Sequence, residues 1–119
     1  MTGSIPPSRR NTLGRSRIET FIGFCIKSGK MSYGSGAIDT LKSGVYLIIL
    51  NGDAAKNTQK LAVKYKNRFN CPLIVCKSEF ELIVNKSGCM LAAVRDRQFA
   101  KLIIENIDNN YELYAGGNF

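Results

Sequence analysis

The residue types that most often perform catalysis in proteins are scarce in this sequence. It contains no histidine, so it has no imidazole base, no Ser-His or Cys-His pair and none of the commonest metal ligands. An enzyme or small-molecule site would rest on Asp53 alone, with no second acid, base or metal ligand beside it. We therefore expect no catalytic residues, no cofactor, no metal and no small-molecule substrate.

The four cysteines point in the same direction. They include no Cys-x-x-Cys pair, and each lies in an apolar segment. This pattern is typical of buried, reduced thiols in a cytoplasmic protein, and it does not have the ligand spacing of a four-cysteine metal site. The four residues are Cys25, Cys71, Cys76 and Cys89.

The chain carries an excess of positive charge. Its 119 residues include 17 Lys and Arg against nine Asp and Glu, for a formal net charge of +8. An excess of this size on a small domain favours a polyanionic partner, and nucleic acid more than a membrane surface. Residues 1–17 contain four of the basic residues and no acidic one, so half of the net charge lies at the amino terminus.

The amino-terminal composition predicts a basic disordered arm over residues 1–15. This stretch is rich in Pro, Gly, Ser and Arg and has almost no large apolar side chains. Two interpretations stay open, a solubilising tail and a nonspecific phosphate-binding arm. The arm lacks the apolar core of a targeting signal, and the longest strongly apolar run, residues 45–50, is too short to span a bilayer. We expect no membrane partner.

From residue 16 onward, apolar residues alternate between helical and strand spacing. Helices are expected over about 17–28, 36–43 and 57–69, and also beginning near residues 78 and 96. Short apolar strands are expected over 31–33, 45–50, 73–76 and 89–94. Such strands indicate a sheet covered on both faces, which predicts an α/β fold: a three-layer α/β/α sandwich with a mixed sheet of about four strands and about five helices. This domain spans residues 16–107, and residues 108–119 are expected to form a frayed or loosely docked C-terminal tail.

Several helix ends have recognisable signals. Ser16 with Glu19, and Ser78 with Glu81, have the spacing of a capping box, and Asp96 is placed to cap the last helix. The tripeptide Lys-Ser-Gly occurs at residues 27–29, 42–44 and 86–88, each time before an apolar segment. Because lysine complements the carboxyl end of a helix and glycine adopts the left-handed cap conformation, we interpret all three copies as helix ends.

Ligands of open α/β sheets bind beyond the carboxyl ends of the strands. Three segments follow such ends in the predicted fold, and they are 33–36, 51–58 and 75–78. In the first, the two glycines that flank Ser35 allow the backbone to approach a ligand closely, although taken by themselves they favour a tight strand-to-helix turn. The candidate binding residues are Gly34, Ser35, Gly36, Asp53, Lys56, Val75, Cys76 and Lys77.

Five segments in order also carry a family resemblance. They are KSGKMSYG (27–34), LKSG (41–44), YLIILNGDAAKNT (46–58), CPLIV (71–75) and VRDRQFA (94–100). Together they resemble the L-seven-Ae/L-thirty-e superfamily of ribosomal and kink-turn RNA-binding proteins, and in particular its bacterial YlxQ-like branch. The resemblance covers residues 17–104, and DAAKNT after a strand is its most specific piece. It implies the same α/β/α sandwich.

The resemblance implies a noncatalytic, ribosome-associated protein that binds structured RNA such as a kink-turn or ribosomal RNA. In the family, the turn before the second helix and the loop after the third strand contact the RNA. These correspond here to Gly34, Ser35 and Gly36 and to Val75, Cys76 and Lys77, with Asp53 and Lys56 beside them. Residues 35–40 carry no basic side chain, which the family usually has at this point. A protein-interaction module on the same fold is therefore the alternative. Lys60, Lys64 and Lys66 are expected on the solvated face of one helix.

Overall fold

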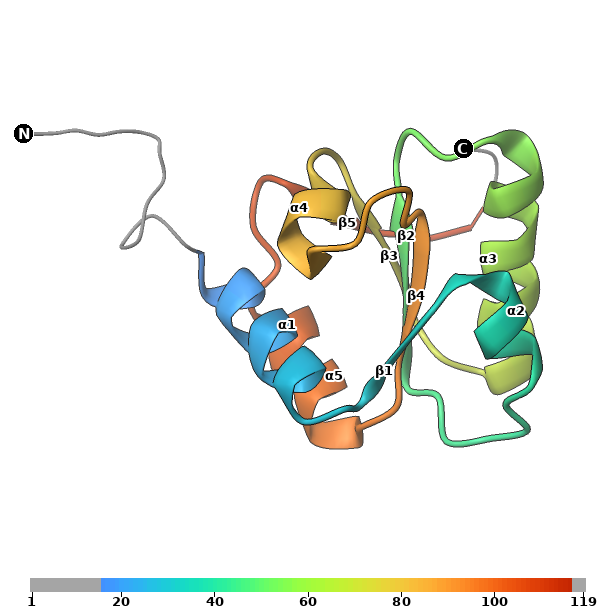
Figure 1. The fold of residues 1–119 in the computed structure, drawn as a ribbon, viewed down its shortest axis with the longest axis horizontal. Coiled ribbons are helices and arrows are strands. Elements are labelled where there is room, and N and C mark those ends of the chain that lie inside the picture. Colours follow the sequence, from blue (N-terminus) through green and yellow to red (C-terminus); the bar gives the residue numbers. More distant parts are fainter. Residues whose placement is uncertain (1–15, 117–119) are drawn as a thin grey trace, which may run out of the picture.

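A five-stranded mixed sheet forms the centre of the computed structural model, which describes residues 16–116 (Figure 1). The strand order is β1-β4-β2-β3-β5; β2 and β3 are parallel, and the other neighbouring pairs are antiparallel. The predicted basic arm over residues 1–15 lies outside the described residues. The strands are β1 (Met31–Tyr33), β2 (Leu47–Asn51), β3 (Leu73–Cys76), β4 (Leu91–Val94) and β5 (Tyr111–Leu113).

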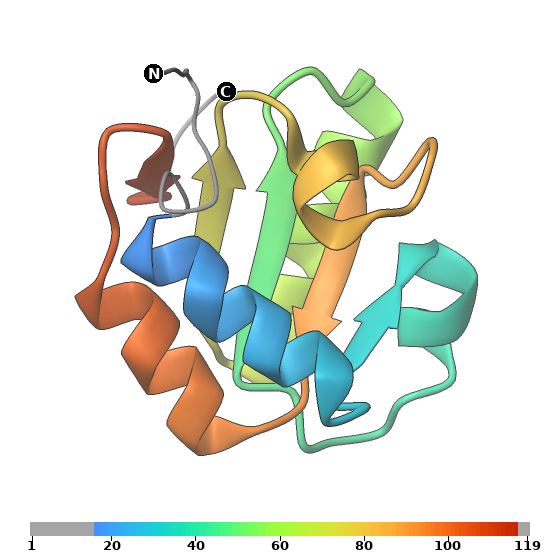
Figure 2. The same cartoon turned by 60° about the vertical axis from the view of Figure 1, so that its left-hand side comes forward.

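Helices cover both faces of the sheet, so the α/β fold and its three layers are confirmed (Figures 1 and 2). One face carries α1, α4 and α5, with α1 and α5 side by side, and the other carries α2 and α3. The helices are α1 (Arg17–Lys27), α2 (Gly34–Asp39), α3 (Lys56–Phe69), α4 (Phe80–Val84) and α5 (Arg97–Glu105).

The central strand β2 contains a continuous run of apolar residues, and its position in the sheet explains why. Successive side chains of a strand point to opposite faces of the sheet. Leu47 and Ile49 pack in the core beneath α1, α4 and α5, whereas Ile48 and Leu50 pack in the core beneath α2 and α3. All four are fully buried. A strand buried on both faces has no polar alternation, which is the pattern that predicted this architecture.

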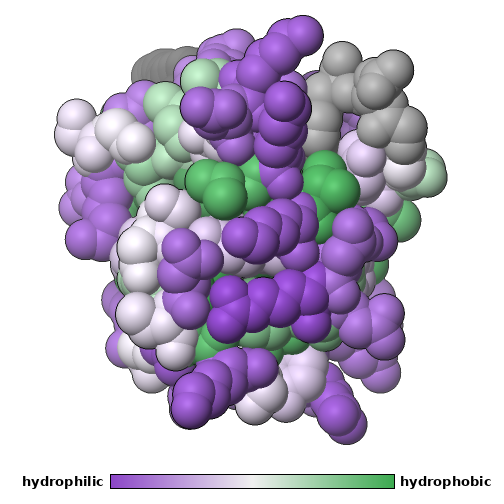
Figure 3. All heavy atoms as spheres, turned by 90° about the vertical axis from the view of Figure 1, so that its right-hand side faces the viewer, coloured by the Kyte–Doolittle hydropathy of each residue, from purple (hydrophilic) through white to green (hydrophobic). Residues whose placement is uncertain are grey.

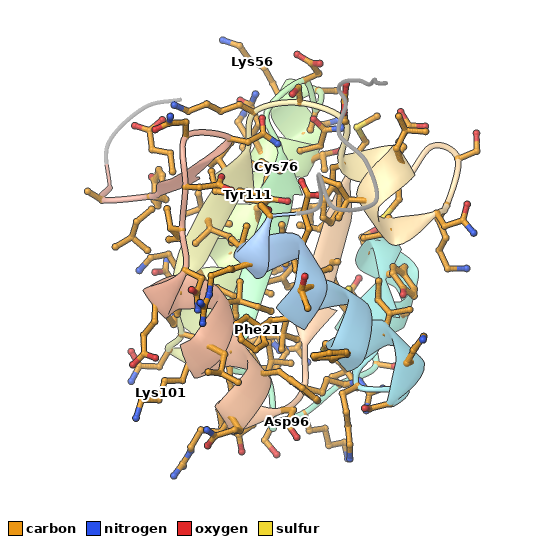
Figure 4. All side chains as sticks on the ribbon, turned by 90° about the vertical axis from the view of Figure 1, so that its left-hand side faces the viewer. Phe21, Lys56, Cys76, Asp96, Lys101 and Tyr111 are labelled. Carbon is orange, nitrogen blue, oxygen red and sulfur yellow. The ribbon has the colours of Figure 1, made fainter. Side chains whose placement is uncertain are left out.

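The prediction of a frayed tail after residue 107 is wrong for residues 111–113. They form β5, which pairs antiparallel with β3, so the sheet has five strands where about four were expected. Tyr111 is only 3% exposed, and its side chain lies near Cys76 (Figure 4). Burial of this ring and pairing with the otherwise free edge of β3 hold the segment in place. In this three-residue strand Tyr111 is buried and the next two residues are exposed, so the segment has no apolar pattern that would predict it.

Two of the predicted helix caps form. The side chain of Ser16 accepts a hydrogen bond from the Glu19 amide, and that of Asp96 accepts one from the Phe99 amide. The capping box predicted at Ser78 does not form, because α4 begins later, after Glu79 in a left-handed conformation with φ of 64°. Ser78 instead donates its hydroxyl hydrogen to Oδ1 of Asn110, 2.9 Å away, and so joins this loop to the segment before β5.

Only the first Lys-Ser-Gly tripeptide ends a helix. Its Lys27 is the last residue of α1, and Gly29 has a left-handed φ of 70°. The second and third copies lie beyond the helices, since α2 ends at Asp39 and α4 ends at Val84. Their interpretation as helix caps is therefore wrong, and their lysines belong to loops. Within residues 16–116, no helix has both the length and the apolar character needed to cross a membrane.

Candidate functional site

The carboxyl ends of β1, β2 and β3 lie at the same end of the sheet. This follows from the pairing, because β4 runs antiparallel to both β1 and β2, and β2 runs parallel to β3. We call this the loop end, formed by residues 34–36, 51–56, 75–78 and 85–90. Lys56 lies here and Asp96 at the opposite end of the molecule (Figure 4).

Two of the predicted segments are joined directly at the loop end. The amide of Gly52 donates a 2.8 Å hydrogen bond to the carbonyl oxygen of Cys76. A Cβ atom at Gly52 would lie 3.3 Å from that oxygen, so glycine permits the close approach. The buried side chain of Asn51 shapes the same loop, because its Oδ1 accepts a hydrogen bond from the Asp53 amide. The segments that contain Asp53 and Lys77 are therefore held as one unit.

The side chain of Cys76 lies beneath this unit and forms hydrogen bonds that hold it. Cys76 is fully buried, as predicted for all four cysteines, so its side chain belongs to the core beneath the loop. Its thiol donates to the carbonyl oxygen of Ser78, 3.1 Å away, and the side-chain amide of Asn110 donates to its sulfur. Burial raises the pKa of the thiol to about 11. The neighbouring Val75 is half-buried and Lys77 is exposed, so these two remain available to a ligand.

The Gly34 turn forms a separate part of the loop end. Gly34 has a φ of 81°, a left-handed conformation that glycine adopts without strain and that turns the chain from β1 into α2. Gly36 is exposed, and a Cβ atom at this position would meet nothing within 4 Å. The carbonyl oxygen of Ser35 accepts a 3.3 Å hydrogen bond from the hydroxyl of Tyr65, which attaches the turn to α3.

The predicted site residues thus fall into two groups. Neighbouring strands are about 4.8 Å apart, so β1, which precedes the first group, lies roughly 10 Å from β2 and roughly 14 Å from β3, which precede the second group. The first group is the Gly34 turn, and the second is the unit that carries Asp53, Lys56, Val75 and Lys77. A ligand that contacts both groups must be larger than a typical metabolite.

Lys86 joins the first group, although the sequence interpretation made it a helix cap. Its ammonium nitrogen lies 4.8 Å from the centre of the Tyr33 ring, and Tyr33 is the residue directly before Gly34. The surrounding loop is held by Glu81, whose Oε2 accepts a 2.5 Å hydrogen bond from the Gly88 amide. The contact joins residues far apart in the chain, so no local pattern revealed it.

Burial keeps three weakly acidic groups at the loop end, Tyr33, Cys76 and Cys89, in their neutral forms. Burial raises the pKa of Tyr33 and of Cys89, in addition to that of Cys76. An activated nucleophile requires the opposite shift. Among residues 16–116, no three His, Cys, Asp or Glu side chains are close enough together to hold a metal ion. The exposed charges here are instead those of Lys56, Lys77 and Lys86, with Asp53 and Glu79 as the acidic groups.

Comparison with known proteins identifies a shared fold. No protein-family model matches the chain, and no curated protein matches it. Among solved structures, a protein of unknown function from Bacillus halodurans superposes with a TM-score of 0.65. The match has 18% sequence identity and covers 76% of this chain and 96% of that chain. At this identity the likeness shows that the two proteins have the same fold.

Proposed function

We propose that this chain is a noncatalytic RNA-binding protein of the L-seven-Ae-like type, which binds structured RNA such as a kink-turn or ribosomal RNA at the loop end. The arrangement of the two groups at that end carries the proposal. They present exposed backbone and cationic side chains at the ends of strands that lie roughly 10 to 14 Å apart, which suits a folded RNA that offers several phosphates and bases at once. The sequence resemblance named the same two regions independently of their positions in space.

Each group has a distinct role in this proposal. The Gly34 turn and the exposed Gly36 allow RNA backbone or a base edge to approach the protein main chain. Lys86 and Lys77 supply phosphate contacts on either side, and Val75 supplies a small apolar surface beneath a base. Buried, neutral thiols suit a ribosome-associated protein of the reducing cytoplasm.

The direct test is a titration against three RNAs over a series of salt concentrations. They are a kink-turn, the same RNA with its sheared G·A pairs replaced by Watson–Crick pairs, and an unrelated hairpin. We expect the kink-turn to bind most tightly. Absence of binding to all three at moderate salt would contradict the proposal. Deletion of residues 1–15 should leave the preference for the kink-turn over the other two RNAs unchanged, because the arm is expected to add only nonspecific attraction to RNA.

Charge reversals locate the interface. Lys77→Glu and Lys86→Glu should each weaken kink-turn binding about tenfold and lower the salt slope by about one. Lys101→Glu is the matched control, since this exposed lysine lies on α5, away from the loop end (Figure 4). Gly36→Phe should block the close approach of RNA to the main chain. The fold should be retained, because there is open space at this position. Unchanged affinity in all three loop-end variants would place the interface elsewhere.

A protein-interaction module is the second candidate. It is favoured by Leu82 of α4, which is 76% exposed, and by the absence of basic side chains over residues 35–40. Purification from cell extract with and without ribonuclease separates the two candidates. RNA binding predicts that copurifying partners are lost on ribonuclease treatment. Partners that persist, and that are lost in Leu82→Ser, would favour the interaction module.

A further inference from the structure

An open depression of about 440 Å³ lies at the end of the sheet opposite the loop end. Its walls come from the segment before β2, from the end of α3 through Pro72, and from Arg97 at the start of α5. Arg97 follows Asp96, which Figure 4 shows far from Lys56. The volume falls in the range of small-ligand sites, and no predicted site residue lines it.

Among residues 16–116, three cations and no carboxylate line this depression. The cations are Lys42, Arg68 and Arg97. One of them is paired, because the Asp39 carboxylate lies 3.8 Å from the Arg68 guanidinium. Asp39 also accepts the Tyr65 hydroxyl, and Asp96 caps α5. Among the described residues, Lys42 and Arg97 have no ion-pair partner. The excess positive charge favours an anionic ligand.

Backbone donors add to this charge. The segment that holds Lys42 continues through Ser43 and Gly44, all three of which are exposed. Within the part of the chain that the structure describes, the amides of these three residues donate to no protein acceptor. A run of free amides beside two unpaired cations is an arrangement that binds phosphate oxygens.

Two aromatic rings complete the depression, each with a guanidinium group above it. The central carbon of the Arg97 guanidinium lies 5.5 Å from the centre of the Tyr46 ring, and that of Arg68 lies 5.1 Å from the centre of the Phe69 ring. Nucleobases stack on aromatic rings and on guanidinium planes. The site therefore combines surfaces for a base with donors for a phosphate.

A line of cations on α3 connects the depression with the loop end. Lys56, Lys60, Lys64 and Arg68 recur at every fourth position, and α3 contains no acidic residue. Like charges at this spacing destabilise an isolated helix, and an acidic residue among them would relieve the repulsion. The helix spans the molecule between its two ends, and hydrophilic side chains cover much of this face (Figures 1 and 3). The predicted solvated face is thus also a line of positive charge, at the end of which Arg68 pairs with Asp39.

We propose that the depression binds a nucleotide. Lys42, Arg97 and the free amides of Ser43 and Gly44 hold its phosphate, and its base packs against Tyr46 and the guanidinium above that ring. The nucleotide is either free or an unpaired nucleotide of an RNA strand whose backbone follows the α3 cations. This site is separate from the loop end and does not depend on kink-turn binding there.

The experiment is an NMR titration of the isotope-labelled full chain, with the amide signals of Ser43 and Gly44 as reporters. The probes are each of the four nucleoside 5′-monophosphates, a single-stranded RNA decamer and inorganic phosphate. Shifts caused by monophosphates assign a free nucleotide, and shifts caused only by the decamer assign RNA. No shift with either, or equal affinity for inorganic phosphate and every nucleotide, would overturn the proposal.

Variants of the lining residues provide the second part of the experiment. The double variant Lys42→Gln/Arg97→Gln should bind the responsive probe at least about tenfold more weakly, since each charge-assisted contact contributes. Lys101→Gln on the same helix as Arg97 is the control and should bind normally. If the double variant is poorly folded, Lys42→Gln alone is used, because Lys42 lies in an exposed loop. Equal loss in Lys101→Gln would refute the site. Kink-turn affinity should be unaffected by the double variant, which separates this proposal from the function proposed above.

Discussion

The hydroxyl of Tyr65 in α3 donates a 2.7 Å hydrogen bond to Oδ1 of Asp39 at the end of α2, and it also lies 3.3 Å from the carbonyl oxygen of Ser35 at the beginning of α2. The ring of Tyr65 is fully buried. Helix α2 has six residues and no side-chain N-cap, and helices of this length are unstable in isolation. A single buried hydroxyl therefore fixes both ends of the helix that begins with the Gly34 turn.

Removal of this hydroxyl should destabilise the protein. In Tyr65→Phe the Asp39 carboxylate loses the hydroxyl and keeps the Arg68 guanidinium 3.8 Å away, so the free energy of unfolding should fall by about 1–3 kcal/mol. Urea unfolding measures the change. The control is Tyr46→Phe, because no described residue forms a hydrogen bond with the Tyr46 hydroxyl and its ring remains beneath Arg97. Equal effects of the two variants would show that the Tyr65 hydroxyl has no special role.

The two glycines of the turn should respond oppositely to alanine. Gly34→Ala forces a side chain into a left-handed conformation and should destabilise by about 1–2 kcal/mol. Gly36→Ala lies within α2, in open space and without a positive φ, so it should be neutral or stabilise by up to about 1 kcal/mol. Thermal unfolding of the two variants tests this contrast. Destabilisation by Gly36→Ala as large as that by Gly34→Ala would contradict it.

The buried thiols predict a loss of stability at alkaline pH. Burial raises the pKa of Cys25, Cys71 and Cys76 from 9.0 to about 11. The unfolded chain therefore releases these protons at lower pH than the folded protein does. Their stabilising contribution is complete below pH 9 and is lost as the pH rises towards 11. Urea unfolding across this range should show a falling midpoint.

Tyr65 extends the same trend, because burial and the hydrogen bond to Asp39 raise its pKa to about 12. Stability should consequently continue to fall between pH 10 and pH 12, and less steeply in Tyr65→Phe. A midpoint that is constant or rises between pH 9 and pH 12 would contradict both predictions.

At pH 8 the four free cysteines should react with a thiol reagent only at the rate of unfolding, since all are buried.

The fifth strand should contribute strongly to stability through one side chain. Tyr111→Ala removes a ring that is only 3% exposed and should destabilise by about 3–5 kcal/mol. Leu113→Ala is the control, because Leu113 belongs to the same strand and is 50% exposed, so its loss should cost less than about 1 kcal/mol. Guanidinium unfolding gives both values. If Tyr111→Ala lowered the free energy of unfolding only slightly, residues 111–113 would not be an integral part of the sheet.

Local patterns in the chain predicted most of the secondary structure and part of the candidate site. The strand over residues 73–76 has the predicted bounds, and Ser16 and Asp96 cap the helices that they were expected to cap. These features depend on hydrogen bonds and apolar spacing within a few residues. The strand-end rule also placed Gly34, Lys56 and Lys77 at one end of the sheet, and they lie there because β1, β2 and β3 run in the same direction.

Contacts between distant residues decided the rest. The sequence by itself determined an α/β sandwich, since apolar periodicity specifies which elements form and which faces they bury. Tertiary structure alone decided that Tyr111 pairs with β3, that the Cys76 thiol contacts Ser78 and Asn110, and that Lys86 reaches Tyr33. It also brought Lys42 and Arg97, which are 55 residues apart, to one depression. Strand pairing and side-chain packing create such neighbours, and neither depends on spacing along the chain.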